Sequence, residues 1–134
     1  MVNIETRVVR VKNDEVIDVK TNEIYTLQDV PIKIHKTKAL RNRRNSNYKA
    51  IATIVDIFDA NDDIKARHIF LLAFIPRYVL DIRYNFYKKE YEPVIEPTKR
   101  LTNQEQEKLK KVMYFVSKMD DAIRHTYTTL PVEA

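Results

Sequence analysis

Glycine is absent from all 134 residues of this chain. Glycine is the residue that most readily takes positive φ or lets a backbone approach a phosphate group closely. Its absence therefore excludes the P-loop, the dinucleotide-binding fingerprint and the nucleophile elbow, each of which needs glycine at fixed positions. Tight turns must instead use Asn and Asp, which tolerate the left-handed backbone region best among the remaining residues.

Composition places the chain among folded globular domains. Hydrophobic residues make up 44% of it and charged residues 32%, a balance that argues against wholesale disorder. There is no cysteine, so disulfides, thiolate catalysis and cysteine-ligated metal centres are excluded. A chain of this length can bury one hydrophobic core, and we expect a single domain over residues 1–134.

Neither a membrane span nor a leader is visible in the sequence. The longest apolar run, Ile69–Ile75, ends at Pro76 and is much shorter than the roughly 20 residues that cross a bilayer. The N-terminus lacks the basic-then-apolar pattern of a signal peptide. We therefore expect no membrane partner, and a location in the cytoplasm or in a virion assembled inside the cell.

Strand patterns dominate residues 1–90. β-branched residues are concentrated at 4–11, 16–20 and 48–58, and Asn13-Asp14 and Thr21-Asn22 are turn signals between them. A short strand is also expected at 23–27. Residues 64–75 fit either a strand or one helix face, and the run from Phe70 to Phe74, apolar on both sides, favours a central strand.

Residues 78–87 show the clearest period of two. The side chains predicted to share one face are Tyr78, Leu80, Ile82, Tyr84 and Phe86. Lys88–Lys99 contains two prolines and is expected to be an extended connector.

The C-terminal part predicts an amphipathic helix. Thr102 and Glu105 have the spacing of a capping box. Apolar residues then recur at helical spacing, at Leu109, Val112, Val116, Met119 and Ile123, with Tyr127 extending the stripe. We therefore expect an α+β fold, with a strand-rich part (1–90), a connector (91–101) and a helix (102–127). The sheet should be antiparallel and strongly curved, or a small OB-like barrel, of about five strands.

The basic charge is concentrated in the segment Ile32–Lys49. It contains Lys33, Lys36, Lys38, Arg41, Arg43, Arg44 and Lys49 and no acidic residue. The chain has 24 Lys and Arg and 19 Asp and Glu. Without these seven, 17 basic residues remain against the 19 acids, a net charge of −2. Such a run is either a solvated loop or a surface for a polyanion, because a phosphate backbone would neutralise it and release counterions.

Aromatic residues beside this segment are candidates for stacking on bases. Tyr48 adjoins the basic run, and Tyr87 lies next to Lys88 and Lys89 on the predicted polar side of its strand. Tyr91 is a third candidate. The predicted nucleic-acid-binding residues are therefore the seven cations of Ile32–Lys49 together with Tyr48 and Tyr87.

No catalytic motif stands out, and we expect no enzyme activity, cofactor or metal. His35, His68 and His125 are too far apart in the sequence to indicate a metal site. Asp18-Val19-Lys20 has the acid-x-Lys spacing of some metal-dependent nucleases, with Glu5 and Glu15 as further acids. Alternation on a surface strand explains this tripeptide equally, so nuclease activity is the weakest of the alternatives.

Two function classes remain open. The first is a non-enzymatic nucleic-acid-binding protein that prefers single-stranded DNA and has little sequence specificity. The second is a structural assembly protein, such as a small phage virion or head–tail connector component, in which the basic segment contacts an acidic protein surface or packaged DNA. The second class also predicts homo-oligomers.

Overall fold

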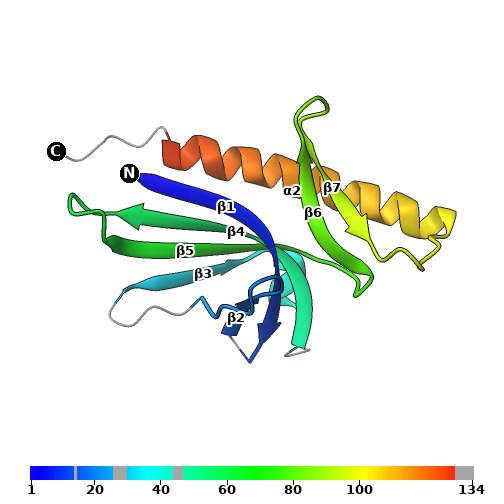
Figure 1. Cartoon of the computed structure of the whole chain (residues 1–134), viewed down its shortest axis with the longest axis horizontal. Helices are drawn as coiled ribbons and strands as arrows, with labels where there is room; N and C mark the ends of the chain where they lie inside the picture. Colours follow the sequence, from blue (N-terminus) through cyan, green and yellow to red (C-terminus); the bar gives the residue numbers. More distant parts are fainter. Residues whose placement is uncertain (14, 26–29, 44–46, 129–134) are drawn as a thin grey trace.

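Five strands form one curled sheet in a computed structural model that describes residues 1–13, 15–25, 30–43 and 47–128. Their order across the sheet is β2 (Glu15–Asp18), β1 (Val2–Lys12), β4 (Asn47–Phe58), β5 (Ile64–Phe74) and β3 (Ile32–Lys36). Figure 1 shows these strands bending into a half-barrel. The predicted α+β class and curved sheet of about five strands are confirmed, as is the strand at 64–75.

One pair of strands departs from the antiparallel expectation. β3 and β5 pair in parallel, whereas β1–β2, β1–β4 and β4–β5 are antiparallel. The cause is the chain path. After β3 the chain passes through the short helix α1 (Lys38–Arg41) into β4, and β5 then returns into the place between them. Both β3 and β5 run antiparallel to β4, so they are parallel to each other.

β4 is buried on both of its faces. Ala50, Ala52 and Ile54 belong to one apolar cluster, and Ile51 and Val55 belong to another; none is more than 3% exposed. The first cluster, here called the inner core, contains Val16 of the edge strand β2 and is joined by Ile32 of the opposite edge strand β3. It therefore fills the concave side of the half-barrel.

The outer core lies on the convex side, beneath helix α2 (Asn103–Thr128). The helix stripe is confirmed: the residues predicted to face the sheet are buried or half-buried (Leu109, Val112, Val116, Met119, Ile123 and Tyr127). Met113, Ser117 and Asp120 are also buried, so the contact face is wider than the stripe predicted. The capping box is present, since the Thr102 hydroxyl accepts from the Glu105 amide and the Glu105 carboxylate accepts from the Thr102 amide.

The segment expected to be a connector forms a strand. β6 (Val79–Asn85) and β7 (Glu90–Ile95) pair as an antiparallel hairpin, and Pro93 lies opposite Ile82. A proline lacks an N–H, but it is tolerated in a strand that has one free edge, and β7 is such a strand. Pro93 therefore did not prevent pairing, and the prediction of a connector was wrong for residues 90–95; Pro97 follows the strand.

The predicted alternation in 78–87 is only partly correct. Ile82 is buried and Tyr84 half-buried, but Leu80 is 45% and Phe86 81% exposed. The register shifts between Val79 and Asp81, so Val79 points inward and Leu80 does not. Phe86 lies beyond the last paired residue, where the strand no longer fixes its direction.

Asn and Asp occupy the turns, as the absence of glycine predicted. Asn13, Asn22 and Asp62 take positive φ at 49°, 60° and 62°. Lys89, in the turn between β6 and β7, does so as well at 56°.

The short strand expected at 23–27 is described only in part. Ile24 makes a single bridge to Ile17, and residues 26–27 lie outside the described residues. Within the described residues, no helix is long and apolar enough to cross a membrane.

The packing of α2 can be tested at Val116, which is 0% exposed. Val116→Asp gives up the burial of a large apolar side chain, about 1.5–3 kcal/mol, and leaves a carboxylate without a partner. We expect it to unfold the domain or release α2, measured as a large fall in Tm. Ala122→Asp, at an exposed position of the same helix, should lower Tm by a few degrees at most. An unchanged Tm in Val116→Asp would contradict this architecture.

Candidate nucleic-acid interface

Helix α1 closes one end of the half-barrel and holds cations toward solvent. Leu40 is 2% exposed and belongs to the inner core, which anchors the helix. Thr37, just before the helix, donates its amide to Leu71 O at 3.2 Å and its hydroxyl to Leu72 O at 3.1 Å. With Leu40 directed inward, Lys38 and Arg41 lie on the exposed side of α1.

The structure places most of the predicted cations at or near this end. Lys33, Lys38 and Arg41 are exposed, and Lys36 is half-buried at the end of β3. The Arg41 Nε donates to Lys36 O at 2.8 Å. Within the described ranges, Lys33, Lys38 and Arg41 form no ion pair with an acid. Arg44 lies outside the described residues.

Arg43 and Phe74 form an aromatic–cation contact on the same surface. The guanidinium carbon of Arg43 lies 3.6 Å from the centroid of the Phe74 ring and 5.2 Å from that of Tyr48. Phe74 is 42% exposed. It is the last residue of β5, and the sequence pattern predicted only that it belongs to an apolar strand.

Tyr48 is not available for stacking. It is 7% exposed and belongs to the inner core, because it shares the inward-facing side of β4 with Ala50 and Ala52. Tyr91 is also buried, at 8%, in the outer core. The expectation that these two rings could stack on bases was wrong. Phe74 is the exposed aromatic beside the cations.

Tyr87 is exposed but lies elsewhere. Its exposed fraction is 99%, and it sits in the turn between β6 and β7. Figure 1 shows this turn projecting past α2, on the side away from α1. The structure therefore does not bring Tyr87 together with the basic segment.

Lys49 connects the basic segment to neighbouring strands. Its Nζ donates to Val79 O at 2.6 Å and to Arg77 O at 3.2 Å. The pKa of Lys49 is lowered first by burial and then by the charge of Arg10, which lies opposite Lys49 on β1. Arg10 and Arg77 are exposed and were missed from the sequence, since each is isolated there. We call Lys36, Lys38, Arg41, Arg43, Lys49, Arg10, Arg77 and Phe74 the basic end surface.

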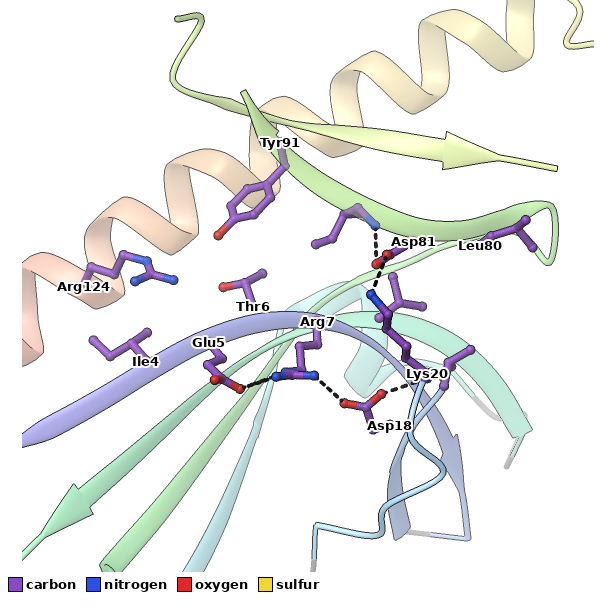
Figure 2. A pocket seen from close by; sticks show the side chains of 13 residues that line it. Ile4, Glu5, Thr6, Arg7, Asp18, Lys20, Leu80, Asp81, Tyr91 and Arg124 are labelled. Carbon is purple, nitrogen blue, oxygen red and sulfur yellow. Dashed lines mark hydrogen bonds and ion pairs between the residues drawn. The ribbon is translucent and has the colours of Figure 1, made fainter. Parts of the chain in front are cut away.

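A separate polar cavity of about 420 Å³ lies between β1, the end of β2, β6 and α2 (Figure 2). Its charges are mutually compensated. Arg7 pairs with Glu5 at 2.8 Å and with Asp18 at 3.1 Å, and Lys20 pairs with Asp81 at 3.7 Å. Arg124, which also lines the cavity, pairs with the buried Asp120 at 2.8 Å. Three cations and three acids line the cavity (Arg7, Lys20 and Arg124; Glu5, Asp18 and Asp81), so the lining carries no excess charge of either sign.

Asp18, the residue on which the nuclease alternative depends, has a structural role. It is 1% exposed, and its carboxylate accepts hydrogen bonds from Arg7, the Tyr25 hydroxyl and the amides of Lys20 and Thr21. Burial alone would raise its pKa, but these hydrogen bonds and the charge of Arg7 lower it. A carboxylate whose two oxygens already accept four hydrogen bonds is a poor metal ligand. Over the described residues, no group of three or more His, Cys, Asp or Glu could hold a metal ion.

Two of the three histidines meet on the convex side of the sheet. His35 Nε2 and His68 Nδ1 lie 3.3 Å apart, and the Tyr127 hydroxyl is 3.1 Å from His68 Nδ1. The His35 ring also stacks on Phe70 with centroids 4.7 Å apart. Pairing of β3 with β5 brings the two histidines together, which spacing in the sequence did not indicate. Burial, then the nearby His35 and Lys33, lower the pKa of His68.

The lowered pKa of His68 predicts a loss of stability at acid pH. Below its ordinary pKa of about 6.5, the unfolded chain takes up a proton that the native His68 does not. The free energy of unfolding should therefore fall as the pH drops below about 6.5. His68→Gln should reduce this fall. Urea unfolding of the wild-type protein and the variant at pH 8 and pH 6 measures the difference, and an equal pH response in the two proteins would refute this role of His68.

In comparisons with family models, curated proteins and solved structures, nothing matched this chain.

Proposed function

We propose that this protein binds single-stranded nucleic acid, with DNA as the first choice, through the basic end surface and without catalysis. One observation carries the proposal. Lys38 and Arg41 are directed to solvent by a buried leucine between them, and no acid pairs with either in the described part of the chain. Cations held in this way repel one another until a polyanion neutralises them.

The distribution of charge supports one binding surface. The whole chain has a net charge of +5, yet residues outside Ile32–Lys49 carry a net charge of −2. The excess positive charge of the chain therefore favours contact of a phosphate backbone with the end of the half-barrel at which this segment lies. Arg10 and Arg77 extend the positive area at that end.

Phe74 provides a surface for a base. Proteins that bind single strands combine a basic surface with aromatic rings on which bases stack, at about 1–3 kcal/mol per base. Arg43 covers part of the Phe74 ring, and a guanidinium plane is itself a stacking partner for a base. Arg43 and Phe74 together therefore offer a stacking surface that does not discriminate between bases.

Little sequence specificity is expected. Reading of base edges in duplex DNA needs a helix or β-ribbon that enters the major groove. α1 has four residues, about one helical turn, and its side chain in the middle of the turn is committed to the inner core. Contacts with phosphates give affinity and position without reading sequence.

A non-enzymatic role is favoured by the polar cavity, whose charges are compensated, and by Asp18, whose carboxylate already accepts four hydrogen bonds. We propose the cytoplasm as the location.

A structural assembly role is a second candidate. It is favoured by the exposed aromatic side chains of the β6–β7 turn, which lie away from the basic end surface. In that role the protein would be part of a virion, and the basic end surface would contact packaged DNA or an acidic neighbouring protein.

Binding to a short labelled oligonucleotide across a salt series tests the proposal. Affinity should fall steeply with salt, because each neutralised phosphate of a single strand contributes about −0.7 to the log–log slope. Replacing Lys38, Arg41 and Arg77 with Ala should weaken binding and flatten the slope by roughly two units, for three contacts. Fluorescence anisotropy measures both quantities.

The matched control removes three exposed cations elsewhere, with Arg100, Lys108 and Lys111 changed to Ala; its slope should be unchanged. Phe74→Leu should weaken binding at an unaltered slope, since stacking releases no counterions. Absence of binding by the wild-type protein at low salt would end the nucleic-acid proposal. Equal losses in both triple variants would mean that the charge acts without a defined surface.

Catalysis is tested with the same oligonucleotide and Mg²⁺ or Mn²⁺. We expect no cleavage, because Asp18 has no free lone pairs for a metal. Gel analysis of the incubated strand is the measurement. Metal-dependent cleavage that Asp18→Asn abolishes, while circular dichroism shows a folded variant, would restore the nuclease alternative.

A further inference from the structure

Three polar side chains from different elements meet on the convex side of the sheet. His35 lies on the edge strand β3, His68 lies on β5, and Tyr127 lies near the end of α2. His35 Nε2 is 3.3 Å from His68 Nδ1, and the Tyr127 oxygen is 3.1 Å from the same Nδ1 atom. We call these three residues the histidine cluster. None of its members belongs to the basic end surface.

Hydrogen bonds alone do not satisfy the histidine cluster. A neutral imidazole nitrogen carries either one proton or one lone pair. His68 Nδ1 can therefore make one good hydrogen bond, yet both His35 Nε2 and the Tyr127 hydroxyl lie within hydrogen-bond distance of it. A cation placed between the three atoms would accept a lone pair from each of them, and so would satisfy all three.

The distances within the cluster match those between ligands of one metal ion. Zn²⁺ binds histidine nitrogen at about 2.0–2.1 Å in tetrahedral geometry, so two nitrogen ligands of one ion lie about 3.3–3.4 Å apart. The two histidine nitrogens are 3.3 Å apart, and the tyrosine oxygen, at 3.1 Å, is slightly closer. To bind an ion, the rings would have to turn their lone pairs toward a common point. His35 is exposed on an edge strand, which leaves its ring room for this rotation.

We propose that His35 and His68 together bind one divalent transition-metal ion, such as Zn²⁺, Ni²⁺ or Cu²⁺, with the Tyr127 oxygen as a third and weaker contact. Imidazole suits these ions, whereas Mg²⁺ and Ca²⁺ prefer carboxylate and carbonyl oxygens. Because the third residue is a tyrosine, the site differs from a cluster built only of His, Cys, Asp or Glu. The other coordination positions are open to water, since His35 is exposed.

The protonation state of the cluster also suits a metal ion. A histidine must be neutral to act as a ligand. Burial, followed by the charges of His35 and Lys33, lowers the pKa of His68, which keeps its ring neutral at neutral pH. The charge of Lys33 also opposes a bound cation. We therefore expect micromolar affinity, weaker than that of a closed structural site with four protein ligands.

A bound ion would fasten the edge of the sheet to the helix. The three contacts come from β3, β5 and α2, so one ion would link all three elements. His35 and His68 are 33 residues apart in the chain, and the unfolded chain does not hold them together. An ion that binds only the folded chain stabilises it by mass action.

Thermal unfolding with added Zn²⁺ tests the site. At about a hundredfold excess of Zn²⁺ over its dissociation constant, the Tm of the wild-type protein should rise by at least about 5 °C. His35→Phe keeps a ring that can stack on Phe70 but has no nitrogen. This variant and His68→Gln should each lose most of the rise. His125→Gln removes the remaining histidine of the chain and should keep the rise. Each comparison uses the change in Tm on adding Zn²⁺, not the Tm itself.

Electron paramagnetic resonance with one equivalent of Cu²⁺ identifies the ligands. The wild-type spectrum should show splitting from two nitrogen atoms, and the His35→Phe spectrum from fewer than two. No rise in Tm with Zn²⁺ up to about 1 mM, an equal rise in His35→Phe, or loss of the rise in His125→Gln would each overturn the proposal. The two histidines would then be a hydrogen-bonded pair only. Nucleic acid is absent from these measurements, so their failure leaves the nucleic-acid proposal untouched.

Discussion

The fold depends on the burial of β4 on both faces. A central strand with apolar side chains on each side needs cover on each side, and the chain supplies it from two different elements. Leu40 of α1 packs into the inner core, and α2 covers the outer core. The position of α1 follows from this requirement, because its one buried side chain has to reach the concave side of the sheet. The exposed cations of α1 are a consequence of the same anchoring.

Polar contacts then fix how α2 lies on the sheet. Thr6 of β1 and Thr53 of β4 share a hydrogen bond at 2.8 Å, and both bond to the buried Asp120 of α2, which Arg124 neutralises. A buried carboxylate is costly unless it is paired, so a shifted helix would leave it unsatisfied. The apolar stripe supplies most of the attraction between helix and sheet, and these bonds specify one register. The same network includes Arg124, which also lines the polar cavity beside it.

Regular periodicity could be read from the sequence, and local irregularity could not. The stripe from Leu109 to Ile123, the capping box and the Asn and Asp turns each follow from a rule that acts over a few residues. β7 was missed because a free edge tolerates Pro93, and nothing local shows which strand has a free edge. At the site, the exposed cations of Ile32–Lys49 were predictable from charge alone. The burial of Tyr48 and the exposure of Phe74 depend on which face of the curled sheet each residue occupies, and that is set by strands far apart in the chain.

The proposed function depends on contact between nucleic acid and the anchored α1 end of the half-barrel. Hydrogen–deuterium exchange of the protein alone and saturated with a thymidine oligonucleotide tests it most directly, because it locates the contact. We expect slower exchange at residues 36–43 and 73–77 and no change at residues 86–89, the turn between β6 and β7. Protection confined to α2 or to that turn, with 36–43 unaffected, would mean that the nucleic acid binds elsewhere.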